Sequence, residues 1–163
     1  MTINTHTRRK VVHDSSQYAV HEAYFITICT LKKICYFGKV VGDKTELTEV
    51  GRMVDDTISN MNDRFPETII ENHVIMPNHI HLILNLVKIE KADSRYSISD
   101  IIRDFKSYTT REYCKPHGNL LIPLWQRGYY DRRIRDKDEL AAINKYIDEN
   151  PRKWKQDKFY ARY

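Results

Sequence analysis

The chain has 163 residues and a mass of 19.5 kDa, which is enough for one ordinary domain with a hydrophobic core. Its 27 lysines and arginines exceed its 22 aspartates and glutamates, and the net charge of +5 favours an anionic partner such as nucleic acid. The sequence has no long apolar run, no visible secretory leader and only 3 cysteines, which form no CxxC pair. A membrane protein, a secreted disulfide scaffold and a zinc ribbon are therefore disfavoured, and we expect a cytoplasmic protein.

The first half of the sequence predicts an arm followed by four elements. Residues 1–19 are polar and basic with little periodicity, and we interpret them as an N-terminal arm. The β-branched and aromatic residues at 24–30 predict a strand. Apolar residues at helical spacing across 47–65 predict an amphipathic helix. Strands are predicted at 68–76 and 79–87, and the Pro-Asn turn between them predicts an antiparallel hairpin.

The second half predicts two more helices with a strand between them. Apolar residues across 98–105 lie on one helical face, with Ser97 or Ser99 near the cap of that helix. A strand is predicted within 124–134 and a helix at 137–149. The order strand, helix, strand, strand, helix, strand, helix predicts an α+β fold. We expect a ferredoxin-like or RRM-like antiparallel sheet with the helices packed on one face.

Two histidines alternate along the second strand of the predicted hairpin. Because side chains point to alternate faces of a strand, His79 and His81 project from one face while Ile80, Leu82 and Leu84 project from the other. Two imidazoles on one face can bind a divalent metal when further ligands come from elsewhere. The pattern also fits two surface histidines on a half-exposed strand, and the pair alone favours that simpler interpretation.

The last predicted helix carries a tyrosine and an asparagine one turn apart. Tyr146 and Asn150 are four residues apart, so they lie on one helical face at the edge of the apolar stripe. The phenol is a candidate nucleophile and the amide a candidate oxygen ligand. A boundary tyrosine and a capping asparagine explain the same residues, and the helix alone favours that explanation.

Cations alternate with aromatic rings between the second and third predicted helices. The pattern suits phosphate contacts and base stacking on single-stranded nucleic acid, and it suits equally an edge strand protected by charge. A basic side of the second helix is supporting evidence only. The candidate nucleic-acid contacts are Arg127, Tyr129, Tyr130, Arg132, Arg133 and Arg135, with Arg103 and Lys106 on the helix.

Four blocks of the sequence, in this order, resemble a known family. The blocks are Tyr24-Phe25-Ile26-Thr27, Met76-Pro77-Asn78-His79-Ile80-His81-Leu82, the segment from Trp125 to Arg135, and Tyr146-Ile147-Asp148-Glu149-Asn150-Pro151. The second block is similar to the HUH motif, in which U is a bulky apolar residue. Together the blocks resemble the single-tyrosine HUH transposases, in particular the REP-associated tyrosine transposases and their insertion-sequence relatives.

The resemblance covers most of the chain and implies a division into three parts. These are a basic arm (1–19), an HUH tyrosine transposase domain (20–155) and a short C-terminal tail (156–163). The implied activity is that of a metal-dependent single-strand DNA endonuclease and strand transferase, which cleaves and rejoins DNA near hairpins. The implied partner is single-stranded DNA with palindromic elements in a bacterial nucleoid. Relatives act as homodimers or as monomers, and the sequence leaves both states open.

The resemblance also assigns roles to individual residues. Tyr146 matches the nucleophile, which attacks a phosphodiester and forms a covalent 5′-phosphotyrosine. His79, His81 and Asn150 match the ligands of a Mg²⁺ or Mn²⁺ cofactor, which polarises the scissile phosphate. Other tyrosines compete for the nucleophile's role, but only Tyr146 has the Tyr-Ile-x-x-Asn-Pro context. These competitors are Tyr108, Tyr113, Tyr129 and Tyr130.

Three alternative functions remain at this point. A non-catalytic single-stranded nucleic-acid-binding module would need neither the histidine pair nor Tyr146. A metal hydrolase that acts through water would form no covalent adduct with DNA. A domesticated transposase relative would keep the full chemistry but serve host DNA processing, and only genomic context separates it from a mobile element.

Overall fold

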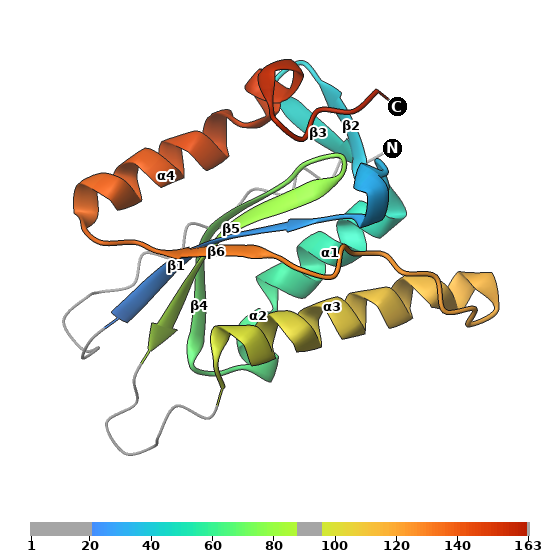
Figure 1. The fold of residues 1–163 in the computed structure, drawn as a ribbon, viewed down its shortest axis with the longest axis horizontal. Helices are drawn as coiled ribbons and strands as arrows, with labels where there is room; N and C mark the ends of the chain where they lie inside the picture. The colour runs from blue at the N-terminus through green and yellow to red at the C-terminus, as the bar shows by residue number, and fades with distance from the viewer. Residues whose placement is uncertain (1–20, 88–95, 163) are drawn as a thin grey trace, which may run out of the picture.

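A computed structural model describes residues 21–87 and 96–162, so the arm predicted at 1–19 lies outside the described residues. The centre of the molecule is a four-stranded sheet with the order β4-β5-β1-β6 (Figure 1), in which every neighbouring pair is antiparallel. The strands are β1 (His21–Cys29), β4 (Thr68–Ile75), β5 (His79–Val87) and β6 (Tyr130–Arg133). The predicted antiparallel hairpin is therefore confirmed as β4 and β5.

One face of the sheet is covered by α1 (Glu49–Ser59) and α3 (Ile98–Cys114). Ile80, Leu82 and Leu84 of β5 are fully buried in the core beneath these helices. Burying each such side chain contributes roughly 1.5–3 kcal/mol, so this face fixes where β5 lies.

Side-chain caps determine where these two helices begin. The Thr48 hydroxyl accepts the backbone N–H of Gly51 at the start of α1, and Ser97 forms a reciprocal capping box with Asp100 at the start of α3. The helix predicted at 47–65 is interrupted at Asn60 and continues as the short α2 (Met61–Arg64). The strand predicted within 124–134 is limited to β6, because Trp125 forms only an isolated bridge with Thr30.

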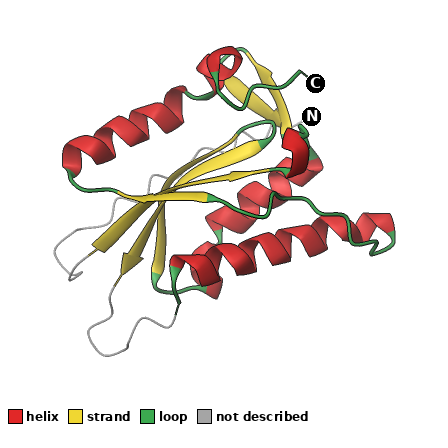
Figure 2. Cartoon of the chain, in the orientation of Figure 1, coloured by secondary structure: helices red, strands yellow, loops and turns green. Residues whose placement is uncertain are grey.

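The last helix, α4 (Lys137–Glu149), packs on the opposite face of the sheet (Figures 1 and 2). The α+β class and the antiparallel sheet are confirmed, but the prediction that all helices share one face is wrong. Ile143 and Ile147 of α4 pack with Phe25 of β1 and Ile83 of β5. Phe25 and Ile83 make the second face apolar as well, so this face also needs a cover to exclude water.

The remaining described elements are small. A hairpin of β2 (Gly38–Val41) and β3 (Lys44–Leu47) turns at Gly42, whose φ of 64° is a conformation that glycine adopts without strain. The short 3₁₀ helices are η1 (Leu31–Lys33), η2 (Lys115–His117) and η3 (Pro151–Gln156). None of the helices in the described ranges is long and apolar enough to cross a membrane.

Candidate active site

The two histidines lie on the face of β5 that α4 covers, side by side as their spacing predicts. Both rings are buried, with 0% and 1% of His79 and His81 exposed, so they are not surface residues of a half-exposed strand. Their Nε2 atoms are 3.1 Å apart. The strand geometry therefore brings two ring nitrogens close enough to share a metal ion or a proton.

The second nitrogen of each ring, Nδ1, has a polar side-chain partner of its own. Nδ1 of His79 is 2.9 Å from Oδ1 of Asn78, and Nδ1 of His81 is 2.7 Å from Oγ1 of Thr27. Thr27 is the cross-strand partner of His81 in the register of β1 and β5. Metal-binding histidines in proteins generally have such a partner on the second nitrogen, which orients the ring and sets its tautomer.

Both imidazoles are neutral near neutral pH. Burial lowers the pKa of His79 well below its usual value, and the neighbouring His81 and the cations Lys158 and Lys33 lower it further. Burial, assisted by Lys158, lowers the pKa of His81 to about 3. A neutral imidazole keeps the lone pair that a metal ion binds.

Tyr146 of α4 contacts the histidine pair directly, because α4 covers the face of the sheet on which the pair lies. Its hydroxyl is 3.3 Å from Nε2 of His81, and its ring packs edge-on against Phe25. The side chain remains 40% exposed, so a large substrate can approach it. Burial and the nearby Asp157 raise the pKa of the phenol, while a hydrogen bond from the side chain of Asn150 lowers it. The net effect is a raised pKa, so the phenol carries its proton at neutral pH.

Asn150 ends α4 one turn after Tyr146, where the sequence predicts an oxygen ligand. The residue is 2% exposed, and its Oδ1 has no hydrogen-bond partner among the described residues. A buried amide oxygen without a partner costs free energy, and a bound cation would satisfy it. This unpaired oxygen and the converging imidazoles fit a divalent metal.

The structure adds Asp157 to the candidate ligands. A carboxylate oxygen of Asp157 and one ring nitrogen each of His79 and His81 lie within 4.8 Å of one another. The tail after α4 brings this carboxylate to the site, and its Phe159 ring lies 4.6 Å from the His79 ring. No motif of the sequence points to Asp157, because it lies in a basic segment eleven residues after Tyr146. Only the path of η3 places it there.

Similarity to known proteins identifies the family of this chain. A model of the IS200-like transposases matches residues 39–150, more than half of the chain. The chain belongs to the IS200-like transposase family. An uncharacterised protein of Haemophilus influenzae is 31% identical to it over 171 residues, covering 95% of this chain and 94% of the relative.

Two solved structures share the fold of this IS200-like transposase. One is a REP-associated tyrosine transposase bound to a REP hairpin, with a TM-score of 0.57 and 22% identity over 86% of this chain and 73% of that one. The other is a putative transposase from Deinococcus radiodurans, with a TM-score of 0.52 and 18% identity over 83% of this chain and 95% of that one. The family resemblance that the sequence motifs indicate is confirmed.

The candidate DNA contacts of this transposase divide between the two faces of the sheet. Tyr130 of β6 pairs with Thr27, and Arg132 pairs with Phe25, so both lie on the face of the histidines. Tyr130 is 55% exposed, and β1 lies between its strand and that of His81. Arg132 forms an ion pair with Glu139, and Arg135 pairs with the same carboxylate.

The other candidates lie on the α3 side. Arg133 points to that side of β6 and pairs with Glu22, and the Tyr129 hydroxyl is 3.0 Å from the Ser99 hydroxyl of α3. Arg103 of α3 is exposed and pairs with Asp100 of the same helix. None of these side chains faces the histidine pair, because the sheet lies between them.

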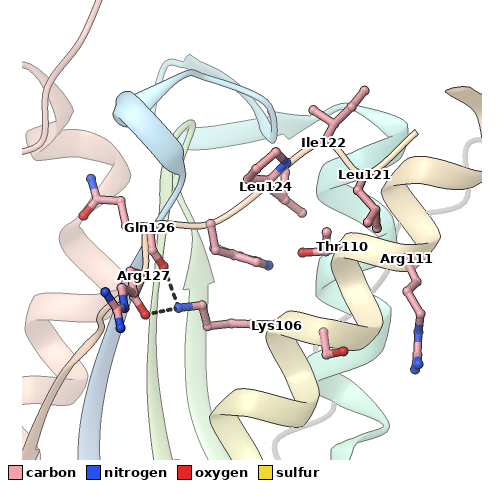
Figure 3. A pocket seen from close by; sticks show the side chains of 11 residues that line it. Lys106, Thr110, Arg111, Leu121, Ile122, Leu124, Gln126 and Arg127 are labelled. Carbon is pink, nitrogen blue, oxygen red and sulfur yellow. Dashed lines mark hydrogen bonds between the residues drawn. The ribbon is translucent and has the colours of Figure 1, made fainter. Parts of the chain in front are cut away.

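Lys106 of α3 has a structural contact that its position in a basic helix does not reveal. Its ammonium donates to the backbone carbonyls of Gln126 and Arg127 (Figure 3) and to that of Gly128, and burial lowers its pKa. It therefore anchors the segment that leads into β6. Lys106, Arg111 and Arg127 also line a pocket of about 410 Å³ beside α3, away from the histidines.

Proposed function

We propose that this IS200-like transposase is a metal-dependent endonuclease and strand transferase for single-stranded DNA. Tyr146 is the nucleophile, and the covalent intermediate is a 5′-phosphotyrosine. The observation that carries the proposal is the 3.3 Å approach of the Tyr146 hydroxyl to the buried histidine pair. Tyr146 and His81 are 65 positions apart in the sequence and lie on different elements, so their contact is not a consequence of local periodicity.

The cofactor would be held by residues of three elements. His79 and His81 supply nitrogen ligands, and Asn150 and Asp157 supply oxygens from α4 and the tail. This mixed donor set suits Mn²⁺ or Mg²⁺. Such an ion polarises the scissile phosphate and neutralises the charge that develops on its oxygens.

The chemistry of the tyrosine follows from its surroundings. The Tyr146 phenol enters the reaction protonated, because its pKa is raised. As its oxygen forms a bond to phosphorus, the phenolic proton leaves, and the bond from phosphorus to the 3′ oxygen breaks to give a free 3′-hydroxyl. The hydrogen bond from Asn150 favours the phenolate. Because the phosphotyrosine conserves the energy of the phosphodiester, the strand can be rejoined by the reverse reaction without ATP.

The substrate is inferred to be single-stranded DNA that carries hairpins. The fold relative bound to a REP hairpin and the net charge of +5 both support this inference. Tyr130 is suited to stacking a base on the histidine face, because it is exposed and lies on the edge strand β6. Arg127, Arg132 and Arg135 belong to the same segment of the chain as Tyr130 and would contact phosphates of the DNA.

A denaturing gel tests the proposal. Purified protein is incubated with Mn²⁺ or Mg²⁺ and labelled hairpin oligonucleotides that include the DNA flanking its own gene. Wild type is compared with Tyr146→Phe and His79→Ala, and with Tyr108→Phe as the matched control, because Tyr108 lies on α3 across the sheet. We expect an SDS-resistant adduct in wild type and Tyr108→Phe and none in the two site variants.

Each other outcome has a definite meaning. An adduct that persists in Tyr146→Phe contradicts the assignment of the nucleophile. Nicking without an adduct indicates that water, not tyrosine, attacks the phosphate. DNA that is bound but never cleaved, on substrates that include the native flanks, supports a non-catalytic binding module.

A further inference from the structure

The side chain of Asn78 has only one orientation that satisfies its neighbours. The residue is fully buried, and its amide nitrogen donates to the carbonyls of Lys33 at 3.1 Å and Phe159 at 2.9 Å. Turning the amide over would place its oxygen against two carbonyl oxygens. The amide oxygen therefore faces Nδ1 of His79 at 2.9 Å, and an amide oxygen can only accept. His79 must carry its proton on Nδ1.

This assignment determines the proton on the second ring. Nε2 of His79 is left with a lone pair, and Nε2 of His81 is 3.1 Å away. Two lone pairs at that distance in a buried site repel each other, so a proton lies between them when no cation does, and the Tyr146 hydroxyl, 3.3 Å from Nε2 of His81, then cannot donate to that nitrogen. The proton belongs to Nε2 of His81. Its Nδ1 is then an acceptor, and the Thr27 hydroxyl at 2.7 Å must be the donor.

We infer that Asn78 and Thr27 are positioning residues with different tasks: Asn78 locks His79 in the Nδ1–H tautomer, and Thr27 lets His81 exchange one tautomer for the other. The difference is chemical. A carboxamide held by two carbonyls cannot turn over, whereas a hydroxyl rotates and can either donate or accept. His79 is thus ready to bind a metal through Nε2, and His81 becomes ready when its proton moves.

The inference rests on the proposed function in one respect, because it takes both Nε2 atoms as metal ligands. For His81 to bind through Nε2, the proton on Nε2 leaves and Nδ1 gains one, so the ring stays neutral. The Thr27 hydroxyl then rotates and accepts from Nδ1–H. Valine at this position has the shape of threonine but leaves Nδ1–H buried without an acceptor, which disfavours the metal-binding tautomer.

Nitrogen-15 NMR of the histidine rings tests the tautomers directly. Protonated and unprotonated ring nitrogens have well-separated shifts, so the metal-free protein at neutral pH should show Nδ1–H for His79 and Nε2–H for His81. Addition of diamagnetic Zn²⁺ should leave the proton of His79 on Nδ1 and should move the proton of His81 from Nε2 to Nδ1. Finding His79 as Nε2–H in the metal-free protein would overturn the inference without bearing on whether the protein cleaves DNA.

Substitution of Thr27 gives a second test. Calorimetry should show Mn²⁺ binding to Thr27→Val about 10-fold or more weaker than to wild type, with binding restored in Thr27→Ser. Thr109→Val is the matched control, because Thr109 is also buried but lies on α3, where it accepts from Trp125. Its Mn²⁺ affinity should equal that of wild type.

The outcomes separate this inference from the proposed function. Equal Mn²⁺ affinity in Thr27→Val and wild type contradicts the role of Thr27. Wild type that binds no Mn²⁺ contradicts the metal site itself, and with it the proposed function, while the tautomers of the metal-free protein still test the roles of Asn78 and Thr27.

Discussion

The two faces of β5 carry side chains of different chemistry, and burying them places different requirements on the neighbouring elements. On the α3 side, Ile80, Leu82 and Leu84 need only apolar neighbours of suitable shape, and α1 and α3 provide them. On the α4 side, His79 and His81 are buried as deeply, yet each ring needs a polar partner for both of its nitrogens. Burial of a polar group without such partners costs roughly 1–3 kcal/mol.

This difference explains how a strand can carry a site without losing its place. The apolar face supplies the free energy that holds β5 in register between β1 and β4. The polar face can then carry functional side chains, because its hydrogen bonds need only offset the free-energy cost of burying the ring nitrogens. Further along β5, Ile83 packs under Ile143 and Ile147, so α4 is anchored next to the histidines by apolar contact.

The largest expected effect is on activity and comes from the polar face. His81→Ala should lower the yield of covalent DNA adduct below detection, because it removes a proposed metal ligand that contacts both His79 and the proposed nucleophile Tyr146. Its far-ultraviolet circular dichroism should match that of wild type. An adduct at the wild-type level in this variant would mean that the polar face is not the site.

The complementary change is on the apolar face. Leu82→Ala should lower the free energy of unfolding by about 2–5 kcal/mol, because it leaves a cavity in the core between β5 and the helices. Urea denaturation measures this, and below the melting temperature the variant should still form the adduct. Loss of the adduct from fully folded Leu82→Ala would contradict the separation of the two faces.

A smaller effect is expected where α4 is tied to the sheet by polar contacts. The Asn72 amide of β4 donates to Asn144 at 2.9 Å and Asp148 at 3.1 Å on α4. Asn72→Ala should cost about 1 kcal/mol of stability, and it should slow adduct formation because Tyr146 lies on the same helix. Asn60→Ala, which removes an amide bond to the Asp56 carbonyl at the end of α1, is the control that should leave the rate of adduct formation unchanged.

The smallest effect concerns the connection between β6 and α4. Glu139 accepts the backbone N–H of Arg135, and its contacts with Arg135 and Arg132 further lower its pKa from 4.5. A carboxyl group whose pKa is lowered by folding stabilises the folded state at pH values above its ordinary pKa. This stabilisation is lost as the pH falls through the lowered pKa. Glu139→Gln should therefore melt below wild type at pH 7. In thermal melts this difference should shrink steadily as pH falls below 4.5, and a constant difference would contradict the assignment.

Much of the site was readable from local spacing alone. The period of two along a strand placed His79 and His81 on one face, and the helical period placed Asn150 one turn after Tyr146. Backbone geometry makes both relations independent of the rest of the chain. β-Branched and aromatic content and alternation likewise predict strands of the sheet, and the order of the motifs indicates the family.

The tertiary structure decided what lies opposite these residues. The face on which α4 packs depends on the path of the chain after β6, and the choice of Thr27 as the partner of His81 depends on the register of β1 and β5. Asp157 reaches the site only because η3 turns the tail back over β5, and Lys106 serves as an anchor only because three carbonyls of a distant segment meet it. Local periodicity fixes the direction of a side chain relative to its own element, whereas its partners are set by long-range packing, which no local pattern encodes.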